Sequence, residues 1–380
     1  MAIISPAAVV AAVVWSVPPV GLGGANPEDT APARLLPAPD IQPTSLPSPA
    51  VNVYASTLSG TVPCPLCQIP ARVYVPNSGA GTVDVIDPRT FKVVGQFPVD
   101  RQPQHVTPSW DLRRLWVGND QGNTLTPIDP RTGTPGRPIP VDDPYNLYFT
   151  PDGRNAIVAA ERLQRLDFRD PTTMRLRHRL PVPCRGVNHM DFTAGGRYAV
   201  VSCEFSAMLL KVDILGRRVV GTLALRAGSV PQDVKLAPDG RVFYVADMAS
   251  GGVWLVDGGR LEIVGFVPTG AGAHGLYVSR DSRYLYVSNR GEGSVSVLSF
   301  ATRKVERTWR LPGGGSPDMG GISADGTVLW LSGRYNAEVY AIDTRSGRLL
   351  ARIPVGRGPH GLCVYPQPGR YSLGHTGVFR

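Results

Sequence analysis

A pattern that recurs seven times along this 380-residue chain constrains its fold more than any other feature. Each copy has an anchor position, an apolar run, a turn of the Pro-Asp-Gly-Arg type and a second apolar run ending near Tyr-Val. The anchors lie 41, 43, 44, 42, 44 and 42 residues apart, at Gln104, Tyr145, Asn188, Gln232, His274, Asp318 and His360. Each interval holds four apolar runs of strand length, separated by turns rich in Gly, Pro and Asp. Four antiparallel strands in 40 to 45 residues are typical of one β-propeller blade, so we predict an all-β, seven-bladed β-propeller of four-stranded antiparallel blades.

The two ends of the repeat region are out of phase with each other. The first blade begins at its second strand, near Arg72, whereas the segment from His360 to Val364 resembles an innermost strand without a blade. We therefore expect the C-terminal strand to join the first blade, close the ring and remove its open edges. The propeller is predicted to span residues 71–366.

Composition agrees with this division of the chain. Gly and Pro make up 43 and 37 of the 380 residues, too many for a mostly helical protein. The apolar stretch at 7–17 is too short to cross a bilayer but suits a secretory signal, although no positive region precedes it. We expect a signal peptide at 1–25, a Pro-rich linker at 26–70 and a C-terminal tail at 367–380. The mature chain is expected to be monomeric, without a transmembrane span, and periplasmic, cell-surface or secreted.

Several segments resemble a known family. These are RVYVPNSGAGTVDVIDPRTFKVVG at 72–95, LYVSNRGEGSVSVLSFATRKV at 285–305 and VYAIDTRSGRLLARIPVG at 339–356. They are similar to the YVTN-repeat, or YncE-like, β-propellers, a resemblance that covers residues 71–366. It implies the fold and an exported or cell-surface protein. It implies no particular activity, because one fold carries many functions.

The predicted fold places the anchor residues and their neighbours around the central channel. They lie where each innermost strand begins, on the face called the top, and four of the six histidines of the chain are among them. The candidate ligand-binding residues of this ring are Gln104, His105, Tyr145, Asn146, Asn188, His189, Gln232, Asp233, His274, Asp318 and His360. The histidines could cap loops, surround a plug of ordered water, or bind a polar ligand, a metal ion or haem. The metal-ligand candidates are His105, His189, His274 and His360; two or three could meet across a narrow channel, whereas ligation by all four is geometrically unfavourable.

Arginines in the same loops extend the candidate site, namely Arg101, Arg185, Arg290, Arg334 and Arg357. Guanidinium groups suit a carboxylate, a phosphate or an anionic polymer. Asp and Glu residues in these loops make the face mixed in sign, and an arginine-rich codon bias explains the net charge of +9 better than an anionic partner does. The sequence has no Lys- or Arg-rich run, so nucleic-acid binding has little support.

The cysteines leave alternatives open. Cys184 precedes the innermost strand of its blade and Cys203 ends the next strand, so the two could form a disulfide, stay as separate thiols or bind a metal with His189. Cys64 and Cys67 could form a redox pair, half of a metal site or an incidental pair in a loop. Cys363, on an innermost strand, is expected to be a buried apolar residue.

Two function classes follow. The chain has no G-x-S-x-G elbow, P-loop, H-E-x-x-H, C-x-x-C-H or EF-hand motif, and we assign no catalytic residue. The first hypothesis is therefore an exported, non-catalytic propeller that binds a polar or anionic small molecule, a polymer or a protein through its top face and channel. The alternative is a hydrolase or oxidoreductase that uses a metal or cofactor with the channel histidines and Asp191, Asp233 or Asp318. The cofactor and the ligand are not identified by the sequence.

Overall fold

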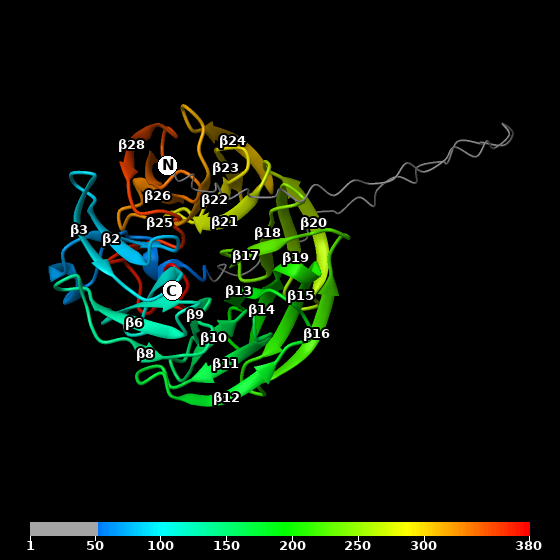
Figure 1. The fold of residues 1–380 in the computed structure, drawn as a ribbon. Coiled ribbons are helices and arrows are strands. Elements are labelled where there is room, and N and C mark those ends of the chain that lie inside the picture. The colour runs from blue at the N-terminus through cyan, green and yellow to red at the C-terminus, as the bar shows by residue number, and fades with distance from the viewer. Residues whose placement is uncertain (1–51) are drawn as a thin grey trace, which may run out of the picture. The chain divides into compact units, whose positions relative to one another are not determined.

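The computed structural model describes residues 52–380, in which 29 strands form seven antiparallel sheets. The sheets succeed one another around a common centre, as the colour sequence of Figure 1 shows. In each sheet the strand nearest the centre comes first along the chain, apart from the first sheet. The predicted seven-bladed β-propeller is confirmed.

The strands of each blade are given from the innermost outward. Blade 1 contains β29 (Cys363–Tyr365), β1 (Arg72–Asn77), β2 (Thr82–Asp87) and β3 (Lys92–Pro98). Blade 2 contains β4 (Pro103–Pro108), β5 (Leu115–Asn119), β6 (Thr124–Asp129), β7 (Thr134–Pro135) and β8 (Ile139–Pro140). Blade 3 contains β9 (Asn146–Phe149), β10 (Ala156–Ala160), β11 (Arg165–Arg169) and β12 (Leu176–Pro181). Blade 4 contains β13 (Val187–Phe192), β14 (Tyr198–Cys203), β15 (Met208–Asp213) and β16 (Arg218–Ala224).

The remaining blades have the same order. Blade 5 contains β17 (Pro231–Leu236), β18 (Val242–Asp247), β19 (Gly252–Asp257) and β20 (Glu262–Pro268). Blade 6 contains β21 (Ala273–Val278), β22 (Tyr284–Asn289), β23 (Ser294–Ser299) and β24 (Lys304–Arg310). Blade 7 contains β25 (Pro317–Ile322), β26 (Val328–Gly333), β27 (Glu338–Asp343) and β28 (Leu349–Pro354). Three short 3-10 helices complete the described part: η1 (Ala55–Thr57), η2 (Leu66–Gln68) and η3 (Glu204–Ser206).

Burial decreases from the centre of the propeller to its rim. Every residue of the innermost strands β4, β13 and β17 is buried, whereas the outermost strand β16 alternates between exposed and partly buried residues. Such alternation is expected of a strand with one face against the next blade and one in solvent. The turn after each innermost strand needs a residue with positive φ, and Gly153 and Gly240 supply it at φ 67° and 72°.

The C-terminal strand closes the ring as expected. Strand β29 pairs antiparallel with β1, with Tyr74 opposite Cys363 and Arg72 opposite Tyr365. Just before β29, the amide of His360 donates to the carbonyl oxygen of Pro76 at 3.0 Å. The two ends of the repeat therefore build one sheet, which leaves no unpaired innermost position in blade 1.

Blade 2 departs from the four-strand expectation at its outer edge. Two short strands, β7 and β8, take the place of one, and both pair with β6. Pro135, Pro138 and Pro140 lie in this stretch. Proline has no amide hydrogen to donate to a strand ladder, so the outer strand is interrupted.

Residues 367–380, expected as a tail, fold back into the centre of the propeller. Ser372 bridges Phe379, and the amide of Leu373 donates to the carbonyl oxygen of Val378 at 2.7 Å. We call residues 371–380 the C-terminal hairpin. Its tip runs from Gly374 to Gly377, and a Cβ added at Gly374 would lie 2.4 Å from a carbonyl oxygen of β9, so only glycine fits there.

The hairpin lies along β9 and enters the channel from the bottom, the end at which the innermost strands finish. The amide of Phe149 donates to the carbonyl oxygen of Leu373 at 2.9 Å, and the amide of His375 donates to that of Leu147 at 2.7 Å. Since β9 runs from top to bottom and the hairpin pairs with it in the opposite direction, the hairpin brings His375 toward the top.

The segment before the first blade also contacts the bottom. The hydroxyl of Tyr54 donates to the carbonyl oxygen of Leu236 at 2.8 Å, and the Arg380 guanidinium lies 5.7 Å from the Tyr54 ring centre. Residues 26–70 are expected to be a linker; their described part, 52–70, contains this contact together with η1 and η2. The expected signal peptide at 1–25 lies outside the described residues. Within 52–380 we find no helix with the length and apolar character needed to cross a membrane.

Candidate functional site

Five histidines from five separate parts of the chain meet inside the channel near its top. They are His105 on β4, His189 on β13, His274 on β21, His360 before β29 and His375 at the tip of the hairpin. We call them the channel histidine cluster. Their rings are in contact range, with centres 4.7 Å apart for His105 and His360 and 4.9 Å apart for His189 and His375. Each side chain is at most 3 % exposed.

Three members of the cluster offer free ring nitrogens to one another. Ligand atoms of His105, His189 and His375 all lie within 4.8 Å of each other. Nδ1 of His105 is 2.9 Å from the carbonyl oxygen of Tyr145. When Nδ1 carries the proton and donates it to this oxygen, Nε2 has a free lone pair. Nε2 of His105, both ring nitrogens of His189 and Nε2 of His375 have no hydrogen-bond partner.

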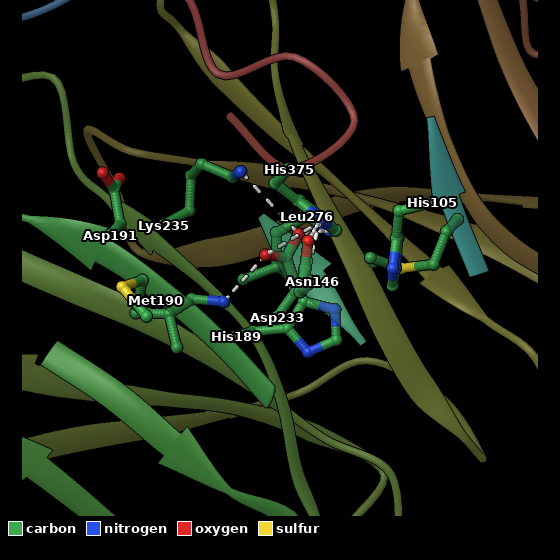
Figure 2. Close-up of polar contacts among 12 residues, drawn as sticks. His105, Asn146, His189, Met190, Asp191, Asp233, Lys235, Leu276 and His375 are labelled. Atoms are coloured by element: carbon green, nitrogen blue, oxygen red, sulfur yellow. Dashed lines mark hydrogen bonds and ion pairs between the residues drawn. The ribbon is translucent and has the colours of Figure 1, made fainter. Parts of the chain in front are cut away.

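Polar residues surround the ring of His375 (Figure 2). Its Nδ1 is 3.2 Å from Nδ2 and 3.4 Å from Oδ1 of Asn146, and its Nε2 is 3.8 Å from Oδ1 of Asp233. Asp233 also lies 3.8 Å from Nζ of Lys235 and accepts the amide hydrogen of Leu276 at 2.9 Å. Burial raises the pKa of Asp233, and Lys235 opposes that rise.

The other side of the cluster is centred on a carboxylate. Asp318 lies 3.0 Å from Nδ1 of His274, 3.5 Å from Nε2 of His360 and 3.2 Å from Nη1 of Arg290. Burial alone would raise the pKa of Asp318, but the charges of His274 and Arg290 hold it below the ordinary value. The carboxylate is therefore paired with His274 and Arg290, while Oδ2 of Asp318 and Nδ1 of His360 have no hydrogen-bond partner.

Burial keeps the imidazoles of His105, His189, His360 and His375 neutral. Burial lowers the pKa of His105 to about 4, and it lowers the pKa of His189, His360 and His375 well below the ordinary value. Neutral imidazoles keep the lone pair that binds a metal ion, and at neutral pH no proton competes for it.

The remaining ring residues predicted from the sequence are buried beside the histidines. Gln104, Asn146, Asn188 and Gln232 are each at most 3 % exposed, and the side chain of Tyr145 is 9 % exposed. Oε1 of Gln104 and Nε2 of Gln232 have no hydrogen-bond partner. These residues line the channel below its rim, where we expected an open mouth.

The five predicted arginines do not converge on one point. Arg290 contacts Asp318, and Arg334 donates to Oγ of Ser78 at 2.6 Å. Arg101, Arg185 and Arg357 are exposed, and each donates to a carbonyl oxygen of a nearby loop, those of Gln121, Phe205 and Gly79. Most of these guanidinium groups therefore join loops of the top face.

An acidic group lies at the top beside blade 3. It contains Asp120, Asp143, Glu161 and Glu204, and Nε of Arg162 donates to Asp143 at 2.8 Å. Burial, reinforced by the charge of Glu204, raises the pKa of Glu161 to about 8. Burial together with Asp143 raises the pKa of Asp120 to about 7.

The cysteines form two disulfides in the described residues. One joins Cys184 to Cys203 across the top of blade 4, and the other joins Cys64 to Cys67. Cys363 is a buried free thiol on β29, and burial raises its pKa strongly.

Sequence reasoning missed His375. It lies after the last repeat copy, so no repeat column placed it in the channel. The available signal was the pattern Tyr371-Ser-Leu-Gly-His-Thr-Gly-Val-Phe379, in which apolar residues flank a Gly-His-Thr-Gly turn.

Comparison with known proteins places the chain among propellers. The family model of the YncE-like β-propeller matches residues 44–369. Protein NirF of Pseudomonas aeruginosa is 32 % identical over 143 residues, which are 36 % of this chain and 34 % of NirF. The match thus spans about a third of that relative.

Two further proteins match over most of the chain. A 6-phosphogluconolactonase of Serratia proteamaculans is 23 % identical over 300 residues, 71 % of this chain and 77 % of that protein. The solved structure of dihydro-haem d1 dehydrogenase NirN in complex with DHE has a TM-score of 0.60 and 16 % identity, and covers 78 % of this chain and 75 % of NirN. At this identity the likeness shows the fold alone, and the named activities differ from one another.

Proposed function

This chain belongs to the YncE-like β-propeller family, and one fold can carry different activities, so we propose its function from the site itself. We propose that the protein binds a divalent transition-metal ion in its channel. The observation that carries this proposal is the meeting of five buried imidazoles from five separate parts of the chain. The sequence predicts a ligand site at the top of the channel, and this proposal narrows that site to the channel histidine cluster and its ligand to a metal ion.

The unpartnered nitrogens are the physical reason. A buried polar atom without a partner costs about 1–3 kcal/mol, and His105, His189 and His375 together have four such atoms. Imidazole nitrogen is a preferred ligand of zinc, copper, nickel and iron ions. A bound ion would satisfy several of these atoms at once, which an apolar or purely anionic ligand could not do.

Enclosure of the site favours binding over catalysis. Every member of the cluster is at most 3 % exposed, and the hairpin closes the channel from below. An enzyme needs a path by which substrate reaches the metal. The alternative, a hydrolase or oxidoreductase, has one supporting feature: three histidine ligands would leave a coordination position open.

Export of the chain is part of this proposal. The two disulfides support it, because disulfides form and persist in oxidising compartments. The dispersed arginines offer little support for an anionic polymer or nucleic acid as the partner. We therefore favour a small inorganic ligand.

Metal titration tests the proposal. The full chain, stripped with a chelator, should bind about one equivalent of Zn²⁺ in calorimetry, and Co²⁺ should give the visible absorption of a nitrogen-ligated ion. His105→Gln should weaken binding by about tenfold or more, whereas His178→Gln, on the outer strand β12, should leave it unchanged. Failure of the unmodified protein to bind Zn²⁺ or Co²⁺ would overturn the proposal.

A second variant perturbs the site without removing a ligand. A Cβ added at Gly361 would lie 2.0 Å from Cδ2 of His105, so Gly361→Ala must displace that ring. We expect Zn²⁺ affinity to fall by about tenfold, measured by the same calorimetry. Gly195→Ala is the matched control, because no atom lies within 4 Å of the added Cβ. Equal affinities of the two variants would argue against the participation of His105.

The enzymatic alternative has its own test. Zinc-loaded protein would be assayed with a 6-phosphogluconolactone, the substrate in the name of one relative. Hydrolysis that disappears in His105→Gln would favour the enzyme, and a rate equal to that of buffer would favour binding alone.

A further inference from the structure

We propose that the metal site consists of His105, His189 and His375, so that a bound ion fastens the C-terminal hairpin inside the channel. This inference rests on the proposed function and deepens it, since it names the ligands and makes hairpin docking depend on the metal. Two ligands come from the propeller strands β4 and β13, and the third comes from a segment outside the blades.

Two groups in the channel bring three ligand atoms within 4.8 Å of one another, and all their residues are buried: His105, His189 and His375 form one, and His274, Asp318 and His360 form the other. The first group is the better candidate because four of its ring nitrogens have no hydrogen-bond partner. A tetrahedral zinc ion with bonds near 2.1 Å holds its nitrogens about 3.4 Å apart, so each ring needs to move by less than about 1 Å. His274 and His360 already face the carboxylate of Asp318.

Neighbouring groups hold two of the rings in position. The carbonyl oxygen of Tyr145 contacts Nδ1 of His105, and Asn146 contacts Nδ1 of His375. Such a contact on one ring nitrogen is the usual arrangement that fixes the other for a metal. Figure 2 shows Asn146 and Asp233 beside His375, where the carboxylate would offset part of the charge of the ion.

The hairpin is attached to the blades by few other polar contacts near its ends. Arg380 donates to Oδ1 of Asp191 at 2.7 Å and to the carbonyl oxygen of Phe192 at 3.3 Å. The amides of Phe149 and His375 join the hairpin to β9, and the amide of Ser372 donates to the carbonyl oxygen of Trp110 at 3.1 Å. The proposed metal ligand His375 therefore lies at the tip of the hairpin, and the ion pair of Arg380 with Asp191 lies at its base. Each can be altered without changing the other.

Metal binding and hairpin docking must then strengthen each other. A hairpin that leaves the channel takes one of three ligands with it, so the ion binds the docked form more tightly. By linkage, the ion shifts the equilibrium toward the docked form by the same factor. In the metal-bound protein the hairpin is fastened, and in the metal-free protein it opens more often.

Hydrogen exchange of the full chain tests this coupling directly. Zn²⁺ should slow exchange of the amides of His375 and Phe149 by about tenfold or more, because each donates a hydrogen bond between the docked hairpin and β9. His375→Gln should abolish this slowing and weaken zinc binding, while His178→Gln should behave like the unmodified protein. Zinc binding by His375→Gln with unchanged affinity would overturn the inference.

Arg380→Gln separates docking from ligation. It removes the ion pair with Asp191 and leaves all three histidines in place, so the hairpin should exchange faster without metal and zinc should slow it again. If the unmodified protein binds zinc but the hairpin exchanges at the same rate with and without it, the inference is wrong and the proposed function survives. If the unmodified protein binds no zinc, the proposed function itself fails.

Discussion

At the scale of single residues, burial sets the protonation of the groups at the top of the channel. It keeps the imidazoles of His105 and His189 neutral and keeps a proton on Glu161 at neutral pH. The two effects have one cause, because a low-dielectric environment disfavours the charged form of either group. The imidazoles thereby gain a lone pair for a ligand, whereas Glu161 makes stability depend on pH.

Glu161 should make the protein less stable as the pH rises. Its pKa is about 8 in the folded protein and near 4.5 in the unfolded chain, so between these values the unfolded chain releases the proton first. The contribution of Glu161 to the free energy of unfolding is therefore largest below about pH 4.5, and it decreases as the pH rises to about 8. Glu161→Gln should remove this fall and raise the melting temperature at pH 8.5 by a few degrees.

Calorimetric melting curves from pH 4 to pH 9 would measure the difference. Glu306→Gln, at an exposed position on β24, is the matched control and should follow the unmodified protein at every pH. Parallel curves for Glu161→Gln and the unmodified protein would show that Glu161 ionises normally.

At the scale of elements, β29 contributes more than its three residues suggest. It covers β1, and it places Val364 in one apolar cluster and Cys363 and Tyr365 in a neighbouring one. A chain that ends at Arg357 exposes the edge of β1 and the apolar surface beneath it. We expect its free energy of unfolding to be lower by about 5 kcal/mol or more, measured by urea denaturation.

A chain that ends at Pro366 is the control for that truncation. It keeps β29 and loses residues 367–380, which include the C-terminal hairpin, so it should retain a closed ring and a larger share of the stability. If the two shortened chains unfold at the same urea concentration, ring closure by β29 is not a major source of stability.

At the scale of the whole molecule, the repeat makes most of the fold predictable. The same strands and turns recur in seven copies. Where the strand pattern of one copy is weak, the other copies still indicate which residues form its strands. The positions of His105 and His189 at the start of innermost strands follow from that repetition. His375 could not be placed in this way, because the hairpin pairs with β9 through contacts that no repeat encodes.

The burial of the site was equally hard to predict. An innermost strand can begin at an open mouth or beneath a cover, and the repeat is the same in both cases. Here Arg290 pairs with Asp318, Tyr145 is buried beside the histidines, and the hairpin lies below them. The interruption of the outer strand of blade 2 had a visible cause in its prolines.

The disulfide between Cys184 and Cys203 should stabilise the whole domain in oxidising conditions. Replacing both cysteines by serine should lower the free energy of unfolding by about 3 kcal/mol, mainly because the unfolded chain loses a cross-link. Urea denaturation without reductant would measure this. A reductant should bring the unmodified protein close to the variant, and identical curves without reductant would contradict the expectation.

Pairing of Arg72 with Tyr365 has a consequence for how the protein is made. The first blade receives its innermost strand only after nearly 300 further residues have left the ribosome or crossed a membrane. Until then, β1 presents an unsatisfied edge to any chaperone or neighbouring chain that meets it. Completion of the ring is therefore a late event in biogenesis, and pairing over such a separation makes it a slow one.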